Sequence, residues 1–122
     1  HYGQDFSVPY GTEVYATGNG TVIESGWNSG GFGNYIVIDH GYGIRSTYGH
    51  LSNIRVTKGL NVKRGDMIGL SGSTGTSSGP HLHYQIEQFG EHKNPINFFN
   101  NDISVEEFNE MIQAYSSKSK FR

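Results

Sequence analysis

Short stretches rich in β-branched and aromatic residues recur along the first 90 positions of the chain, with glycine-rich segments between them. Such stretches predict β-strands, here at residues 12–16, 21–25, 35–39, 44–48, 61–63, 67–71 and 81–88. The segments between them are too short for the helical crossovers that join parallel strands. We therefore expect a mainly β fold, an antiparallel sheet or sandwich.

The pattern changes after Asn94-Pro95. Ser104 and Glu107 have the spacing of a helix capping box, and apolar residues then recur at helical spacing, at Val105, Phe108, Met111, Ile112 and Tyr115. This stripe predicts a C-terminal α-helix that either packs on the domain or binds a protein partner. We divide the chain into a domain at residues 1–100 and a helical extension with a polar tail at residues 101–122.

Composition narrows the function classes. The 122 residues suffice for one domain, and the net charge of −2 without a basic cluster argues against nucleic-acid binding. No apolar run approaches the roughly 20 residues that span a bilayer. Cysteine is absent, which excludes disulfides and thiolate metal sites. Because the chain opens abruptly at His1 in a motif-like segment, we take it to be a mature or excised domain.

Candidate chemistry centres on six histidines, since imidazole is the commonest metal ligand and carries protons near neutral pH. In the predicted strand at 81–88, alternation places His81, His83 and Gln85 on one face of the sheet. The other face then carries the apolar side chains Leu82, Tyr84 and Ile86. The two histidines can therefore converge on one small site.

Two further segments add to this site. His1 and Asp5 lie four residues apart, and His50 follows directly on a predicted strand. Imidazoles and one carboxylate, without a thiol, suit a catalytic zinc ion, for which three protein ligands leave a fourth position for water.

The whole pattern resembles the lysostaphin/LytM-type zinc endopeptidases, which cut the peptide part of bacterial peptidoglycan. The matching segments are HYGQDF at 1–6, PYGTEVYA at 9–16, GNYIVIDHG at 33–41, YGHLS at 48–52, VKRGDMIG at 62–69, GSTG at 72–75 and SGPHLHY at 78–84. The resemblance implies that His1, Asp5 and His83 bind Zn²⁺. It also implies that His50 and His81 are catalytic residues.

A mechanism follows from these roles. Zinc lowers the pKa of a bound water to about 7 and polarises the scissile carbonyl. We predict His81 as the general base because it shares a strand face with His83, and His50 as the group that stabilises the oxyanion or protonates the leaving amine. The sequence equally allows the reverse assignment. Asn34 and Tyr48 are predicted to contact the substrate, with a packing or turn role as the alternative for each.

We expect an open groove whose floor is the sheet carrying His81 and His83, with loops 25–34 and 71–79 as walls, occupied by peptidoglycan peptide stems. The predicted reaction is hydrolysis of an amide bond in peptidoglycan cross-links, with D-alanyl-diaminopimelate links favoured, in the periplasm of the bacterial envelope. One alternative is a non-catalytic module that binds the wall or activates other hydrolases. Another is an oxidative copper enzyme that uses the amine of His1.

Overall fold

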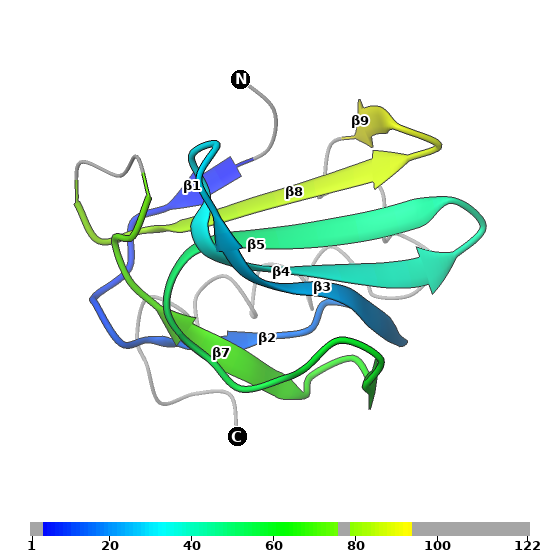
Figure 1. The fold of residues 1–122 in the computed structure, drawn as a ribbon, viewed down its shortest axis with the longest axis horizontal. Coiled ribbons are helices and arrows are strands. Elements are labelled where there is room, and N and C mark those ends of the chain that lie inside the picture. The colour runs from blue at the N-terminus through cyan, green and yellow to red at the C-terminus, as the bar shows by residue number, and fades with distance from the viewer. Residues whose placement is uncertain (1–3, 76–78, 94–122) are drawn as a thin grey trace.

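The computed structural model describes residues 4–75 and 79–93. This part of the chain contains nine strands and no helix (Figure 1): β1 (Gln4–Phe6), β2 (Glu13–Tyr15), β3 (Gly20–Asn28), β4 (Gly33–Gly41), β5 (Ile44–Ile54), β6 (Asn61–Val62), β7 (Met67–Ser71), β8 (Leu82–Gln88) and β9 (Glu91–Lys93). All strand pairs are antiparallel, which confirms the predicted sheet. The predicted C-terminal helix lies outside the described residues. Within the described ranges, no helix is long and apolar enough to cross a membrane.

The strands form one sheet in the order β1-β8-β5-β4-β3-β6. β5 has two successive partners on one side, because its first half pairs with β8 and its second half with β7. β7 in turn pairs with β2. In Figure 1, β2 and β7 lie below the long strands β3, β4, β5 and β8. The sheet thus divides into two parts, and residues of both contribute to one hydrophobic core.

Alternation along the strands decides which side chains enter this core. Leu82, Tyr84 and Ile86 of β8 are at most 2% exposed, as the sequence predicted. Ile36 and Ile38 of β4 are fully buried in the same core. The intervening residues of β8 lie on the opposite face of the sheet, where the functional site is found.

A chain of hydroxyl groups runs through the core. The Tyr48 hydroxyl accepts hydrogen bonds from the Thr17 backbone N–H, at 3.1 Å, and from the Ser46 hydroxyl, at 2.9 Å. Thr17 Oγ1 also lies 2.6 Å from the Tyr84 hydroxyl, and His40 Nε2 lies 2.7 Å from Ser46 Oγ at the outer end of the chain. These contacts satisfy the polar groups that the sheet buries.

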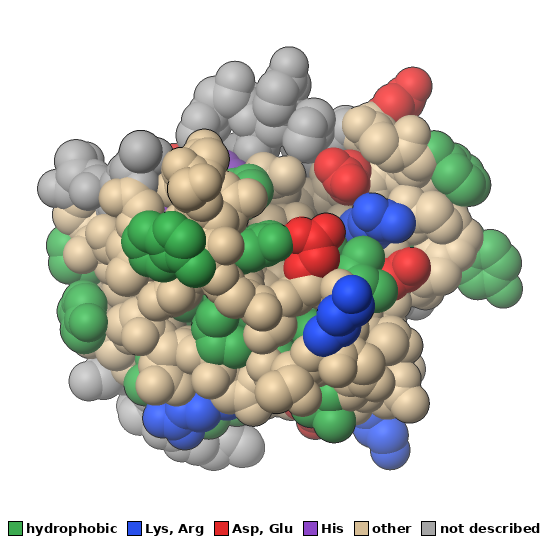
Figure 2. Space-filling model, viewed as in Figure 1, with side chains coloured by type: hydrophobic (Ala, Val, Ile, Leu, Met, Phe, Trp, Pro, Cys, Tyr) green, Lys and Arg blue, Asp and Glu red, His purple; other side chains and the backbone are tan. Residues whose placement is uncertain are grey.

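On the surface of the described part of the chain, acidic and basic side chains lie interspersed over the face shown in Figure 2. The exposed large apolar side chains of this part of the chain are Tyr10, Trp27, Tyr42, Leu60 and Phe89.

Candidate active site

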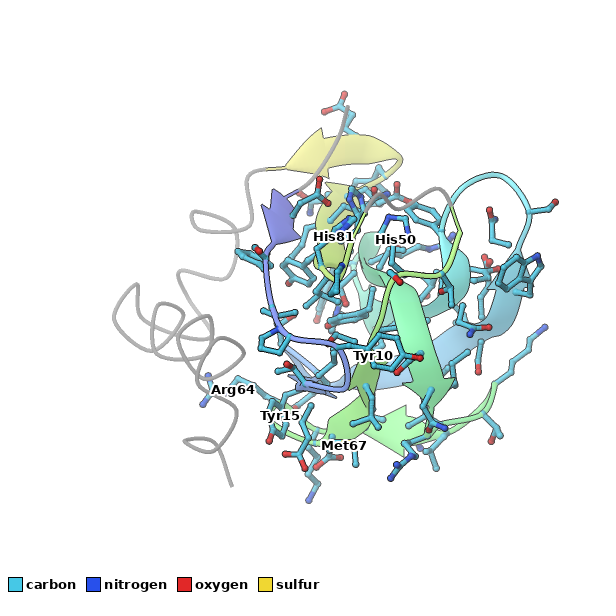
Figure 3. All side chains as sticks on the ribbon, turned by 90° about the vertical axis from the view of Figure 1, so that its left-hand side faces the viewer. Tyr10, Tyr15, His50, Arg64, Met67 and His81 are labelled. Carbon is cyan, nitrogen blue, oxygen red and sulfur yellow. The ribbon has the colours of Figure 1, made fainter. Side chains whose placement is uncertain are left out.

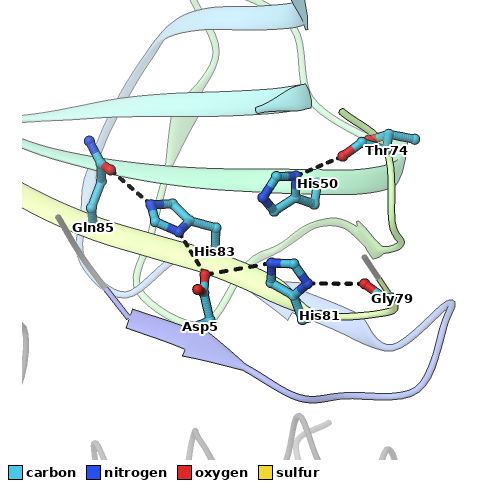
Figure 4. A network of polar contacts seen from close by, with 7 residues as sticks. All are labelled: Asp5, His50, Thr74, Gly79, His81, His83 and Gln85. Carbon is cyan, nitrogen blue, oxygen red and sulfur yellow. Dashed lines mark hydrogen bonds and ion pairs between the residues drawn. The ribbon is translucent and has the colours of Figure 1, made fainter. Parts of the chain in front are cut away.

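Three histidines and one aspartate meet where β1, β5 and β8 lie side by side. Asp5 of β1 is paired with His83 of β8, and His83 is paired with Gly49 of β5, the neighbour of His50. His81 stands just before β8, where its backbone N–H donates a hydrogen bond to the Gly72 carbonyl. Figure 3 shows the rings of His50 and His81 next to each other, and their centroids are 4.6 Å apart. We call Asp5, His50, His81 and His83 the histidine cluster (Figure 4).

Asp5 and His83 form the tightest contact in the cluster. Asp5 Oδ1 lies 2.7 Å from His83 Nδ1, although the two residues are 78 positions apart. The pairing of β1 with β8 brings them together, since Asp5 and His83 are direct partners across the two strands. The other ring nitrogen of His83, Nε2, donates a hydrogen bond of 2.9 Å to Gln85 Oε1, two residues along the same face.

The donor atoms of Asp5 and His83 fit a metal ion. A neutral imidazole carries a proton on only one of its two nitrogens. Since Nε2 of His83 donates to Gln85, the lone pair of a neutral His83 ring is on Nδ1. This lone pair faces the Asp5 carboxylate at 2.7 Å. A shared proton makes the contact of 2.7 Å a hydrogen bond, and a zinc ion could replace that proton, since imidazole nitrogen with carboxylate oxygen is a typical zinc donor set.

The third predicted ligand, His1, lies outside the described residues. Within residues 4–75 and 79–93, no group of three or more histidine, aspartate or glutamate side chains is arranged to hold a metal. The structure therefore brings together two of the three predicted ligands, Asp5 and His83.

A β-bulge in β5 places His50. Between its pairing with Ile36 and its pairing with Asn34, β5 contains one residue more than β4. His50 lies in this bulge with φ of +60°, a left-handed conformation that is uncommon for residues other than glycine. Tyr48 and Leu51, on either side of the bulge, are both fully buried in the core. The bulge thus turns His50 away from the core and into the cluster, a common use of bulges next to active sites.

The protonation state of the His50 ring follows from its surroundings. Nδ1 lies 2.6 Å from the carbonyl oxygen of Thr74, which can only accept, so Nδ1 carries the proton. Burial lowers the pKa of His50 below its ordinary value of 6.5, and the hydrogen bond to Thr74 offsets part of this effect. At neutral pH the ring is therefore uncharged, and Nε2 can accept a proton.

His81 has the same tautomer. Its Nδ1 donates a hydrogen bond of 3.0 Å to the Gly79 carbonyl, and its Nε2 lies 3.6 Å from Asp5 Oδ1. Both predicted catalytic histidines thus use Nδ1 to bind a loop carbonyl, which leaves Nε2 of each as the proton acceptor of the neutral ring.

The two predicted substrate-binding residues lie in different surroundings. Tyr48 is fully buried on the core face, and its hydroxyl is engaged by Thr17 and Ser46. The predicted contact of Tyr48 with substrate is therefore wrong, and the alternative packing role holds. Asn34 is half-buried beside the bulge, where its side-chain amide donates a hydrogen bond of 3.1 Å to the Leu51 carbonyl. A contact between Asn34 and substrate stays a prediction.

Sequence reasoning gave no role to three residues that border the cluster. Gln85 binds His83, and Thr74 binds His50. The ring of Phe32 lies 5.5 Å from that of His83, and its carbonyl accepts the His50 backbone N–H at 2.7 Å. Strand alternation had placed Gln85 on the same face as His83, which was a usable signal. Thr74 lies in the GSTG motif and in the predicted wall 71–79, and Phe32 lies in the predicted wall 25–34, but no local pattern pointed to their contacts with His50 and His83.

Known proteins resemble this chain in sequence and fold. Residues 1–95 match peptidase family M23, so the chain belongs to this family and its resemblance to the lysostaphin-type endopeptidases is confirmed. Over 105 residues it is 47% identical to the peptidoglycan DD-endopeptidase ShyA of Vibrio cholerae, covering 86% of this chain and 24% of ShyA. Over 86 residues it is 48% identical to the glycyl-glycine endopeptidase ALE-1 of Staphylococcus capitis, covering 70% of this chain and 24% of ALE-1.

Solved structures agree with the sequence relatives. The catalytic domain of lysostaphin from Staphylococcus simulans has a TM-score of 0.76 at 41% identity, covering 82% of this chain and 79% of that domain. A zinc containing peptidase from Vibrio cholerae has a TM-score of 0.72 at 43% identity, covering 75% of this chain and 28% of that protein. The chain spans 24% of the length of each of the two relatives above, ShyA and ALE-1.

Proposed function

We propose that this chain is the catalytic domain of a zinc-dependent endopeptidase that hydrolyses an amide bond in the peptide cross-links of peptidoglycan. The observation that carries the proposal is the convergence of Asp5 and His83 with two further imidazoles whose Nε2 atoms can take up protons. Membership of peptidase family M23 and the similarity to ShyA support the same reaction class.

His1, Asp5 and His83 would hold the zinc ion. The paired donors of Asp5 and His83 fit it, and His1 is the third ligand that the family resemblance implies. When bound, zinc supplies a Lewis acid that polarises the scissile carbonyl and makes water more acidic.

The chain's own residues then handle the protons. We assign His81 as the general base, since its Nε2 lies beside the ligand Asp5, at 3.6 Å from Oδ1, and can take a proton from the attacking water. His50, once its Nε2 has taken up a proton from solvent, stabilises the developing oxyanion or gives that proton to the leaving amine. Because both rings have the same tautomer, the reverse assignment uses the same atoms.

The substrate proposal is a D,D-endopeptidase acting on D-alanyl-diaminopimelate links in the periplasm. The sequences GNYIVI at 33–38 and YGHLS at 48–52 favour this link, as does the similarity to ShyA. The similar identity to ALE-1 makes glycyl-glycine links the competing substrate. Peptide stems would lie along the face of the sheet that carries His83, and the segment at 101–122 would be available to a protein partner.

The test is incubation of the full chain with purified peptidoglycan and with defined cross-linked peptides of both link types, followed by mass spectrometry of the fragments. We expect cleavage of the D-alanyl-diaminopimelate link, loss of cleavage on adding a chelator, and recovery with Zn²⁺ but not Cu²⁺. Cleavage of glycyl-glycine links alone would overturn the choice of bond. Binding without cleavage would assign a non-catalytic wall-binding module, and undiminished cleavage by His83→Ala would refute the metal site.

A further inference from the structure

The bulge in β5 interrupts the ladder between β4 and β5, and a side chain from a loop fills the interruption. The backbone N–H of Asn34 in β4 donates a hydrogen bond of 3.1 Å to Thr74 Oγ1. The Thr74 hydroxyl in turn donates a hydrogen bond of 2.7 Å to the carbonyl of Leu51 in β5. A single oxygen atom thus bridges the two strands next to His50.

Thr74 also contacts the His50 ring, through its backbone carbonyl. The carbonyl oxygen of Thr74 accepts the Nδ1 proton of His50 at 2.6 Å. Figure 4 shows this contact on the side of the ring that faces away from His83. The side chain of Thr74 is therefore anchored to the strands that flank the bulge, while its backbone fixes the tautomer of the histidine inside the bulge.

Backbone packing leaves the loop little freedom to shift. Gly33 and Gly75 have φ of +67° and +77° and lie against each other's loops. A Cβ atom on Gly33 would lie 2.5 Å from Thr74 Oγ1, and one on Gly75 would lie 2.3 Å from the Gly31 carbonyl oxygen. The two loops therefore meet at a distance that only glycine permits, and the Thr74 hydroxyl sits in this contact.

We infer that Thr74 is a positioning residue for His50. Its hydroxyl bridge sets the place of its carbonyl, which keeps the proton on Nδ1 and presents Nε2 to the cluster. This inference rests on the proposed function in so far as His50 serves the reaction. Threonine can both bridge the strands and bind the histidine. Its hydroxyl accepts from Asn34 and donates to Leu51 at the same time, while its backbone carbonyl accepts from His50.

The test compares Thr74→Val, which keeps the shape and removes the hydroxyl, with Thr74→Ser, which keeps the hydroxyl. The first readout is the pair of ¹⁵N chemical shifts of the His50 ring in the full chain, which report the tautomer independently of activity. We expect wild type and Thr74→Ser to have Nδ1 protonated, and Thr74→Val to show a mixture of tautomers. The second readout is turnover of a defined cross-linked peptide, for which Thr74→Val should lower kcat roughly tenfold to a hundredfold and change KM by less than about threefold.

Thr12→Val is the matched control. It removes a hydroxyl that donates a hydrogen bond of 2.6 Å to the Pro9 carbonyl, and it does not touch His50. We expect it to lower stability yet leave the His50 tautomer and kcat as in wild type. Should Thr74→Val fail to fold, Thr74→Ala gives the same comparison.

The inference is overturned if Thr74→Val has the ¹⁵N chemical shifts of His50 and the kcat of wild type. It is also overturned if Thr74→Val and Thr74→Ser lose kcat to the same extent. If the wild-type chain cleaves no peptidoglycan, the proposed function fails. The ¹⁵N chemical shifts of His50 still decide whether Thr74 positions that ring, because they do not depend on activity.

Discussion

Replacing Gln85 with leucine should weaken zinc binding while leaving the fold intact. Gln85 Oε1 accepts the Nε2 proton of His83 at 2.9 Å, and leucine keeps most of the volume but offers no acceptor. The His83 ring then loses the contact that orients it and keeps Nδ1 as the electron-pair donor beside Asp5. Loss of such a partner typically costs about 10- to 100-fold in metal affinity, which corresponds to roughly 1.4–2.7 kcal/mol. Because Gln85 is half-buried, the cost in folding stability should stay near 0.5–1.5 kcal/mol, about that of one hydrogen bond.

The assay is competition for Zn²⁺ between the full chain and a chromogenic chelator of known affinity, with urea unfolding of the metal-free proteins measured in parallel. Gln88→Leu is the matched control, since it makes the same exchange on β8 where no hydrogen bond to a histidine is lost. Gln85→Glu keeps an acceptor and should retain zinc affinity. A zinc Kd for Gln85→Leu within about twofold of wild type, or an equal loss in Gln88→Leu, would refute the reasoning.

Three other variants test the catalytic, packing and pH arguments. His50→Ala should lower turnover of a cross-linked peptide by roughly 10²- to 10⁴-fold with bound zinc unchanged, since it removes a proton carrier and no proposed ligand; loss of zinc in this variant would contradict that division. Ile38→Ala should lower the free energy of unfolding by about 2–5 kcal/mol in urea titration, because Ile38 is fully buried in the core; a cost below 1 kcal/mol would mean that the core collapses around the gap. Burial raises the pKa of Tyr48 above its ordinary value of 10.0. Above pH 10 the unfolded chain therefore releases a proton that the folded chain keeps, so stability falls as pH rises, and Tyr48→Phe should show a shallower fall in thermal unfolding between pH 9 and 11.

Local periodicity predicted much of the sheet and one side of the site. The alternation of β8 placed Leu82, Tyr84 and Ile86 in the core and His83 with Gln85 on the other face, because a strand without a bulge has a fixed period of two. The short strands β1 and β9 escaped prediction. Three residues have no recognisable pattern by themselves, and β1 exists through its pairing with β8, which follows it by almost the whole length of the domain.

The error at Tyr48 has a specific physical cause. In a regular strand, residues 48 and 50 share a face, and Tyr48 would then lie on the same side of the sheet as His50. The extra residue in β5 and the positive φ of His50 reverse this relationship. Tyr48 therefore enters the core while His50 leaves it. Bulges depend on pairing with distant strands, and strand periodicity cannot reveal them.

The attachment of β1 has a consequence for how the proposed zinc site would release its ion. Within the described sheet, β1 pairs with β8 alone, through three residue pairs that include Asp5 with His83. Separating this strand breaks few contacts, whereas His50 and His83 lie in β5 and β8, each of which pairs with three other strands. Local opening at such an edge requires far less free energy than global unfolding. In the proposed zinc site we therefore expect the Asp5 carboxylate to separate more readily than His83, and hydrogen exchange of the β1 amides should slow when Zn²⁺ is added, because a bound ion would link the edge strand to the rest of the sheet.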